Sequence, residues 1–203
     1  MAAVPASSRH VCSRSSSALG APTAQWDNNP AFASAAPLEL THWDWPKSGP
    51  EQNHPDYPHP QVQAKAVWDD EYLGILFAVD DHYVQCKGTK FQDMVCMDSC
   101  MEFFVTPLTP HSDASTPYFN FEVSANGTML LYYCTPGKEP AFNPVAEDVW
   151  PAIKMKASLV EVGTPIEPEL TDEHQVYQIE CERTVPCSAH GPVRVLPTHM
   201  QPH

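Results

Sequence analysis

The fold of this chain is decided by residues 95–133, which read VCMDSCMEFFVTPLTPHSDASTPYFNFEVSANGTMLLYY. Three apolar runs are separated by one Pro-, Ser-, Thr- and Asp-rich loop and by one Asn-Gly pair. An Asn-Gly pair between β-type residues is a strong hairpin signal, because both central residues of a type I′ turn need positive φ. The stretch therefore predicts three neighbouring antiparallel strands: Cys100–Val105, Tyr118–Ser124 and Thr128–Tyr133.

Alternation within these strands separates two faces, since successive side chains of a strand point to opposite sides of the sheet. The apolar face, which we expect to lie on the core, carries Met101, Phe103, Val105, Phe119, Phe121 and Val123. The opposite face, which we expect to be open and outward, carries Glu102, Phe104, Tyr118, Asn120 and Glu122. These five are the candidate carbohydrate-binding residues. Two carboxylates, an amide and two aromatic rings could form a ligand platform, and they could equally form a solvated face with ordinary cross-strand pairs.

The rest of the chain predicts further short strands. Gln61–Trp68 and Tyr72–Val79 alternate around an acidic turn, and Val176–Glu182 alternates without interruption. Weaker signals are Leu38–Trp45, Tyr83–Cys86 and Ile153–Val162, the last of which could also be a helix. The 22 prolines forbid long helices. Seven or eight short strands predict an all-β fold, a two-sheet antiparallel β-sandwich of immunoglobulin-like or jelly-roll type.

The segments at the two ends differ from this pattern. We expect a disordered N-terminal tail over residues 1–23, a sandwich domain over 24–186 and an irregular C-terminal tail over 187–203. The first 23 residues lack the apolar region of a secretory signal. Their Ala and Ser content with Arg9 and Arg14 gives a weak organelle-transit signal. Without such a signal, the expectation is a cytoplasmic protein.

Charge and cysteine content restrict the partners and the compartment. The 203 residues include 11 Lys and Arg against 25 Asp and Glu, a net charge of -14. Nucleic acids and anionic membranes need a basic surface, so neither is expected as a partner. The longest apolar run, Leu73–Val79, is too short to span a bilayer. The seven cysteines have irregular spacing, which favours free thiols over disulfides and matches no zinc site.

Two acidic pairs are weak calcium candidates. Asp69 and Asp70 begin the turn between two predicted strands, and Asp80 and Asp81 close the second strand. Calcium takes several oxygen ligands from loops of this kind, but no EF-hand spacing is present and the alternative is a solvated turn. Calcium is therefore a candidate cofactor.

Three segments taken together resemble the family 9 carbohydrate-binding modules: DDEYLGILFAVDD, VCMDSCMEFFVTP and YFNFEVSANGT, in this order. The resemblance runs from about Trp26 to about Pro186. It implies a β-sandwich with a non-catalytic sugar-binding role, often attached to enzymes that degrade xylan or cellulose, with structural calcium in some members. It implies that Glu102 hydrogen-bonds sugar hydroxyls. The family's stacking tryptophan, six residues earlier, is replaced by Cys96, and a second one belongs to the C-terminal part, where the resemblance ends.

Three functions follow as hypotheses. The first is a carbohydrate-binding domain, associated with polysaccharide degradation, that uses the polar face. The second is a structural or interaction sandwich whose sugar site has decayed, which Cys96 supports. The third is a glycoside hydrolase that uses Glu102 and Glu122 as its carboxylate pair. Against the third, an open face offers no device that would raise the pKa of one carboxyl.

Overall fold

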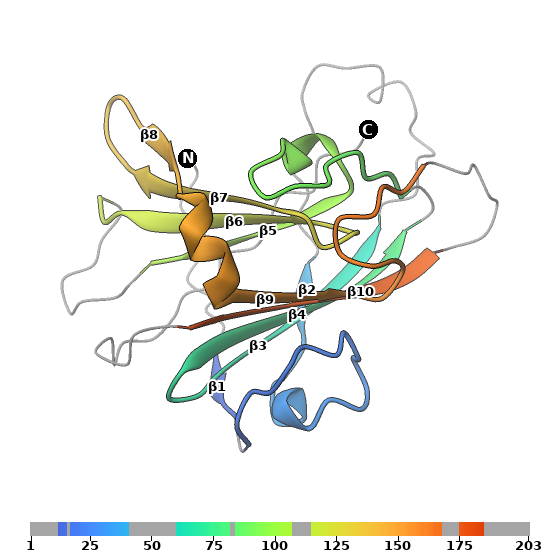
Figure 1. Cartoon of the computed structure of the whole chain (residues 1–203). Helices are drawn as coiled ribbons and strands as arrows, with labels where there is room; N and C mark the ends of the chain where they lie inside the picture. Colours follow the sequence, from blue (N-terminus) through green and yellow to red (C-terminus); the bar gives the residue numbers. More distant parts are fainter. Residues whose placement is uncertain are drawn as a thin grey trace.

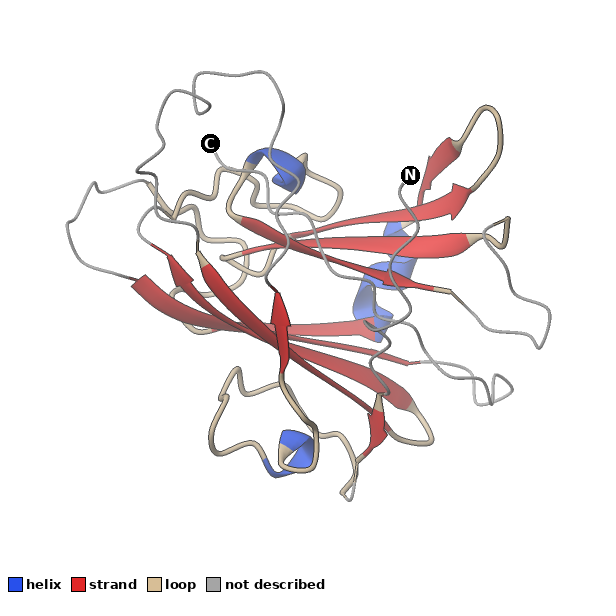
Figure 2. Cartoon of the chain, turned by 180° about the vertical axis from the view of Figure 1, so that it is seen from behind, coloured by secondary structure: helices blue, strands red, loops and turns tan. Residues whose placement is uncertain are grey.

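The computed structural model of the chain describes residues 12–15, 17–40, 60–81, 84–106, 115–167 and 175–184. Of the last range the side chain of Glu180 alone is described. Within these ranges, ten strands form two sheets that face each other, as Figures 1 and 2 show. The predicted all-β sandwich is confirmed. Among the described residues, no helix is long and apolar enough to cross a membrane.

The larger sheet has six strands. Its main path has the order β1-β3-β4-β10-β9, and β2 also pairs with β3. All pairings are antiparallel except the short one between β1 and β3. The strands are β1 (Ser13–Arg14), β2 (Leu38–Leu40), β3 (Gln61–Trp68), β4 (Tyr72–Asp81), β9 (Ile153–Ala157) and β10 (Gln175–Thr184).

The smaller sheet has four antiparallel strands in the order β5-β6-β7-β8. They are β5 (Cys100–Val105), β6 (Tyr118–Ser124), β7 (Met129–Thr135) and β8 (Ala141–Pro144). Within the described ranges, three short 3-10 helices connect elements: η2 (Pro30–Phe32), η4 (Val95–Met97) and η5 (Glu147–Ala152). In Figure 1, η5 carries the chain from β8 of the smaller sheet to β9 of the larger one.

The main core lies between the sheets and is built by the predicted inward faces. Phe103 of β5 stacks on Phe121 of β6 at 4.4 Å between ring centroids, and it meets Phe77 of β4 at 6.2 Å. Other buried members follow the predicted alternation: Val62, Ala64, Ala66, Leu73, Ile75, Val79, Met101 and Val123. The parity assigned to the strands around residues 100–124 is therefore confirmed.

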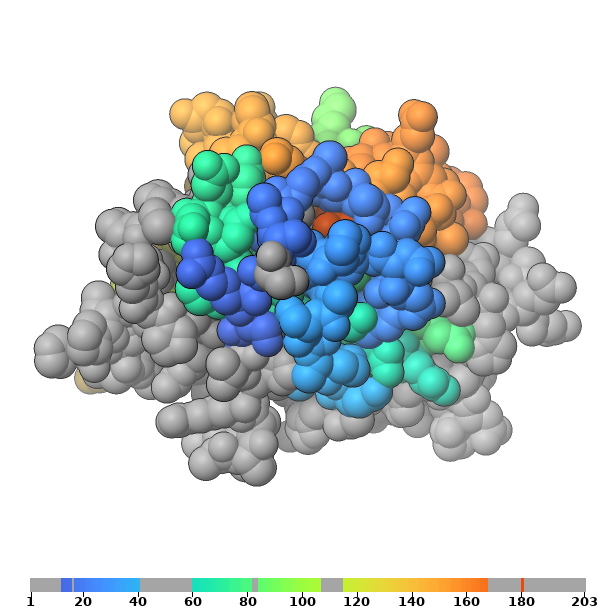
Figure 3. All heavy atoms as spheres, turned by 90° about the horizontal axis from the view of Figure 1, so that it is seen from below, coloured from blue at the N-terminus to red at the C-terminus, as the bar shows by residue number. Residues whose placement is uncertain are grey.

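A second core lies on the outer face of the larger sheet. The N-terminal segment spreads over this face, as the blue atoms of Figure 3 show. Phe32 is fully buried there, and a Cβ at Gly74 would come within 3.0 Å of its ring, so the glycine makes room for it. The cluster comprises Leu19, Ala31, Phe32, Ala35, Val67 and Leu76.

Buried Glu180 fastens the same segment to the sheet. Its carboxylate accepts hydrogen bonds from the backbone N–H groups of Thr23 and Ala24 at 2.8 and 2.9 Å. It also accepts from Asn29 Nδ2 at 3.1 Å. The described residues between 12 and 23 thus pack on the sheet, which corrects the prediction that they form a disordered tail. The limits of the domain stay a prediction.

The β6–β7 hairpin forms as predicted, but its turn is different. Gly127 has φ of 77° whereas Asn126 is not in the positive-φ region, and the N–H of Gly127 donates to the carbonyl of Ser124 at 2.8 Å. The central residues are therefore Ala125 and Asn126, with glycine in the left-handed position after them. The reason is tertiary: buried Asn126 uses its amide Nδ2 to bind the carbonyls of Gly88 and Thr164.

Other sequence predictions have mixed outcomes. The predicted segment Ile153–Val162, which could have been a strand or a helix, is a strand that ends at Ala157. The predicted edge strand Tyr83–Cys86 is reduced, in its described part, to one bridge between Cys86 and Ile166. Leu38–Trp45 is a strand over Leu38–Leu40, and its remainder lies outside the described residues, as do residues 1–11 and the expected tail 187–203.

Candidate functional site

Three neighbouring rows of cross-strand partners build the outer face of the smaller sheet. The first row is Glu102, Glu122 and Leu130; the second is Phe104, Asn120, Tyr132 and Pro144; the third is Tyr118, Cys134 and Phe142. Side chains in alternate rows of a sheet share a face. All five candidate residues therefore lie on one face, next to one another, as the alternation predicted. Their role in binding stays a prediction.

The polar members of this face are not solvent-exposed, which corrects the prediction of an open face. Glu102, Asn120 and Glu122, which we call the polar trio, are only 9%, 5% and 6% exposed. The 3-10 helix η4 packs on this face: it contacts β5, β6 and β7 and is the short green turn above them in Figure 1. Its Val95 is buried against Cys100 and Leu130.

One hydrogen bond joins two members of the polar trio and leaves two acceptors without partners. Asn120 Nδ2 donates to Glu122 Oε1 at 2.8 Å. Among the residues that the structure describes, no donor reaches Asn120 Oδ1 or Glu122 Oε2, although both atoms are buried. Leaving a buried acceptor unpaired costs about 1–3 kcal/mol. The two buried oxygens can therefore each accept a hydrogen bond from a donor that the described part of the chain does not supply.

Burial also changes the protonation of the two carboxyls. Burial, and after it the facing charge of Glu122, together raise the pKa of Glu102 to about 8. Burial raises the pKa of Glu122, which the hydrogen bond from Asn120 partly offsets. Near neutral pH the pair therefore holds a proton. The expectation that no device raises a carboxyl pKa here was wrong, because η4 closes this end of the face.

Aromatic rings border the polar trio on its more open side. Phe104 and Tyr118 are half-buried and meet edge to face at 5.7 Å between centroids. Tyr132 and Phe142 meet in the same way at 6.0 Å, and Phe142 is 55% exposed. Tyr132 and Phe142 were not among the candidates. Extending the alternation from β6 through the hairpin to β7 could have found Tyr132, whereas β8 has no periodic signal.

Cys96 lies beside the polar trio. This half-buried thiol is on η4, and burial followed by the charges of Glu122 and Glu102 raises its pKa. The residue at the expected position of a stacking tryptophan is thus within electrostatic reach of both carboxyls. Cys12, Cys86, Cys96, Cys100 and Cys134, the cysteines whose side chains are described, are all free thiols.

The four calcium candidates do not form one donor set. Asp69-Asp70 and Asp80-Asp81 lie at opposite ends of β4, whose ten residues advance about 3.3 Å each. Asp69 accepts backbone N–H groups of Leu19, Glu71 and Tyr72, and Asp70 pairs with Arg14 at 2.6 Å. Within the described ranges, no group of three His, Cys, Asp or Glu side chains could hold a metal.

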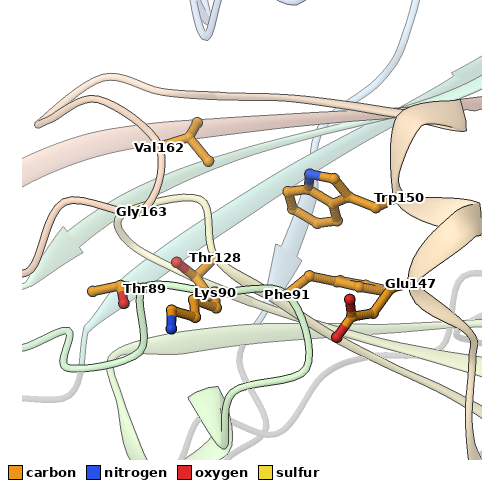
Figure 4. Close-up of a pocket in the computed structure, with 8 residues that line it drawn as sticks. All are labelled: Thr89, Lys90, Phe91, Thr128, Glu147, Trp150, Val162 and Gly163. Carbon is orange, nitrogen blue, oxygen red and sulfur yellow. The ribbon is translucent and has the colours of Figure 1, made fainter.

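A separate pocket of about 480 Å³ opens beside η5, and Figure 4 shows its lining. Phe91 and Trp150 lie at one end with their ring centroids 4.8 Å apart, and Thr89, Val162 and Gly163 lie at the other. Charged groups come from Lys90 and Glu147. The hydroxyl of buried Thr128 already donates to the carbonyl of Gly88 at 3.1 Å. This pocket therefore lacks the buried unpartnered acceptors that distinguish the polar trio.

One family model and two solved structures resemble this chain. The model of carbohydrate-binding family 9 matches residues 48–181. A protein from Bacteroides uniformis, described as a candidate carbohydrate-binding protein, is 22% identical with a TM-score of 0.58 over 80% of this chain and 66% of its own. A family 9 carbohydrate-binding module from Caldicellulosiruptor kristjanssonii, solved with glucose, is 12% identical with a TM-score of 0.50. The match covers 85% of this chain and 68% of that module. No curated protein matches the chain.

Proposed function

The chain belongs to carbohydrate-binding family 9, whose members are typically non-catalytic modules, and we propose that its sugar site is the outer face of the smaller sheet. In this proposal the polar trio binds sugar hydroxyls, and Phe104 and Tyr118 border the ring. The structural neighbours are too distant in sequence to transfer a ligand, so the argument depends on the residues of this chain.

The observation that carries the proposal is the pair of buried acceptors, Asn120 Oδ1 and Glu122 Oε2, without partners in the described part of the chain. A sugar presents neighbouring hydroxyl groups, each a donor and an acceptor. Two such hydroxyls would satisfy both oxygens at once. Because the desolvation cost has already been met in the folded protein, these hydrogen bonds contribute more fully to affinity.

The carboxyl pair adds a donor to the site. With the pKa of Glu102 near 8, one of the two carboxyls carries a proton at neutral pH and can donate to a sugar oxygen. Ring faces supply the remaining contact, since small-ligand sites combine apolar surface with a few directed polar groups. Cys96 offers no aromatic face, so we expect weak binding, in the millimolar range.

The choice of sugar is a proposal drawn from the family. The family 9 module from Caldicellulosiruptor kristjanssonii was solved with glucose, which makes gluco-configured sugars the first ligands to test. We also propose oligosaccharide fragments of cellulose and xylan as ligands, because these would represent binding to the polysaccharides. Association with a polysaccharide-degrading enzyme is part of the same proposal. Calcium, for which the acidic pairs form no common donor set, is not needed for it.

The test is calorimetry of the whole chain with glucose, xylose, cellobiose and xylobiose. We expect Glu122→Gln to abolish measurable binding, because its amide would replace one of the two oxygens that accept hydrogen bonds. Asn143→Ala, which removes an exposed amide from the opposite face of β8, is the matched control and should bind as wild type. No binding by the wild-type chain at tens of millimolar sugar would overturn the proposal.

One observation favours a catalytic alternative. Glu102 and Glu122 face each other, and burial raises the pKa of both carboxyls, that of Glu102 to about 8. A carboxyl that keeps its proton near neutral pH beside a second carboxyl is what a glycosidase needs for its general acid. Turnover of aryl glycosides by the wild-type chain, lost in Glu102→Gln, would establish catalysis. Sugar binding without turnover would leave the module non-catalytic.

A further inference from the structure

The outer face of the smaller sheet continues past the polar trio toward its edge strand. Tyr132 on β7 is the direct partner of Asn120, so the ring stands in the row next to Glu122. Phe142 on β8 follows one row further, opposite Cys134. Neighbouring strands lie about 4.8 Å apart and alternate residues about 7 Å apart. The polar trio and the two rings therefore form one continuous strip.

Electrostatics link Tyr132 to the trio as well. Burial raises the pKa of the Tyr132 hydroxyl, and the charge of Glu122 raises it further. The same ring packs against the buried cluster of Val95, Cys100 and Leu130. Packing on this cluster fixes the position of the Tyr132 ring, which also meets Phe142 edge to face.

Phe142 does not contribute to either core. All four residues of β8 are exposed, and Phe142 is the most exposed large apolar side chain of the sheet. A single exposed apolar residue needs no explanation. Here, however, the residue stands in edge-to-face contact with a second ring, which borders buried polar acceptors. Aromatic surface beside directed polar groups is the composition of a sugar-binding site.

We propose that Tyr132 and Phe142 form a second pyranose subsite, so that the preferred ligand is an oligosaccharide of at least two rings running from the polar trio toward β8. This inference rests on the proposed function, in which the polar trio binds the first ring. The sugar ring packs its C–H face on the aromatic pair, and the Tyr132 hydroxyl offers one hydrogen bond. Continuity with the polar trio is the reason to assign a carbohydrate, rather than a protein surface, to these rings.

The experiment compares ligand lengths in one protein. Calorimetry with glucose, cellobiose, cellotriose and the matching xylose series should show affinity rising from one ring to three. Phe142→Ala and Tyr132→Ala should lower the affinity for the trisaccharide by about fivefold, the size of a typical aromatic contact. Phe142→Ala should leave the affinity for glucose within about twofold of wild type. Tyr132→Phe, which keeps the ring, should recover most of the loss.

Tyr133 supplies the matched control, since it is 38% exposed, adjacent in sequence and on the opposite face of β7. Tyr133→Ala should change the affinity for no sugar. Equal affinity for one ring and three, or an unchanged trisaccharide affinity in Phe142→Ala, would overturn the subsite while the polar trio kept its role. A change of self-association in Phe142→Ala without a change in sugar affinity would also overturn it. Failure of the wild-type chain to bind any sugar would instead overturn the proposed function first.

Discussion

Glu102 and Glu122 are direct cross-strand partners on adjacent antiparallel strands, and both side chains are buried. Two like charges in this position would destabilise the sheet. A proton shared by the pair near neutral pH relieves the repulsion between the two carboxyls. The same proton provides a hydrogen-bond donor on this face, next to the unpartnered acceptor oxygens. Several measurable properties follow from this relationship and from the contacts around it.

The stability of the domain should fall as pH rises. Folding raises the pKa of Glu102 from 4.5 to about 8, so between these values the folded chain binds more protons than the unfolded chain. Stability from this group is complete below about pH 4.5 and is lost as pH rises toward 8, by up to about 1.4 kcal/mol per pH unit. Denaturant titrations of wild type and Glu102→Gln over this range check the prediction. The profile of Glu102→Gln should be flatter than that of wild type, and equal slopes in the two proteins would contradict the prediction.

Cys96→Trp should strengthen sugar binding. The thiol stands on η4 beside both carboxyls, so an indole there would add an aromatic face to the polar trio. A gain of about 1 kcal/mol, or roughly fivefold in affinity, is the expected size. Cys96→Ala, measured in parallel by calorimetry, should leave affinity unchanged. If the tryptophan variant folds and binds no better, the alternative of a decayed site gains support.

Asn126→Ala should be strongly destabilising. The side chain is buried, its Nδ2 donates to the carbonyls of Gly88 and Thr164 at 2.8 and 2.9 Å, and its Oδ1 accepts the N–H of Thr128 at 3.0 Å. Each group left unpaired costs about 1–3 kcal/mol, so the loss should reach several kcal/mol. Asn143→Ala, at an exposed position, should cost less than about 1 kcal/mol. Denaturant unfolding measures the free energy of unfolding of both variants. Similar losses of stability in the two would argue against a structural role for the Asn126 hydrogen bonds.

Glu180→Gln should loosen the N-terminal segment. An amide in place of the carboxylate would point hydrogens at the N–H groups of Thr23 and Ala24, which Glu180 now accepts. Hydrogen bonds to a charged group contribute about 1.5–3 kcal/mol each. We expect faster tryptic cleavage after Arg14 in Glu180→Gln than in wild type or in Glu147→Gln. Equal cleavage rates in the three proteins would count against the anchoring role.

The sequence predicted the sandwich and the faces of its central strands because alternation depends on local geometry alone. Alternation that places the apolar side chains of two neighbouring strands inward also places their polar side chains together on the opposite face. The inward set is Met101, Phe103, Phe121 and Val123, and the opposite set is Glu102, Asn120 and Glu122. The same logic predicted a hairpin after Ser124. The predicted turn type was wrong, because the conformation of Asn126 is set by its hydrogen bonds to Gly88 and Thr164. Both residues are distant from Asn126 in the chain.

What the sequence determined by itself is therefore which side chains share a face, since period-two alternation is a property of each strand. The tertiary structure alone decided how exposed that face is. The η4 turn, placed by packing of Val95 on Cys100 and Leu130, buries the carboxyls and raises their pKa values. Only strand pairing brought Tyr132 and Phe142 beside them, because the order of strands in a sheet is set by contacts between segments far apart in the chain.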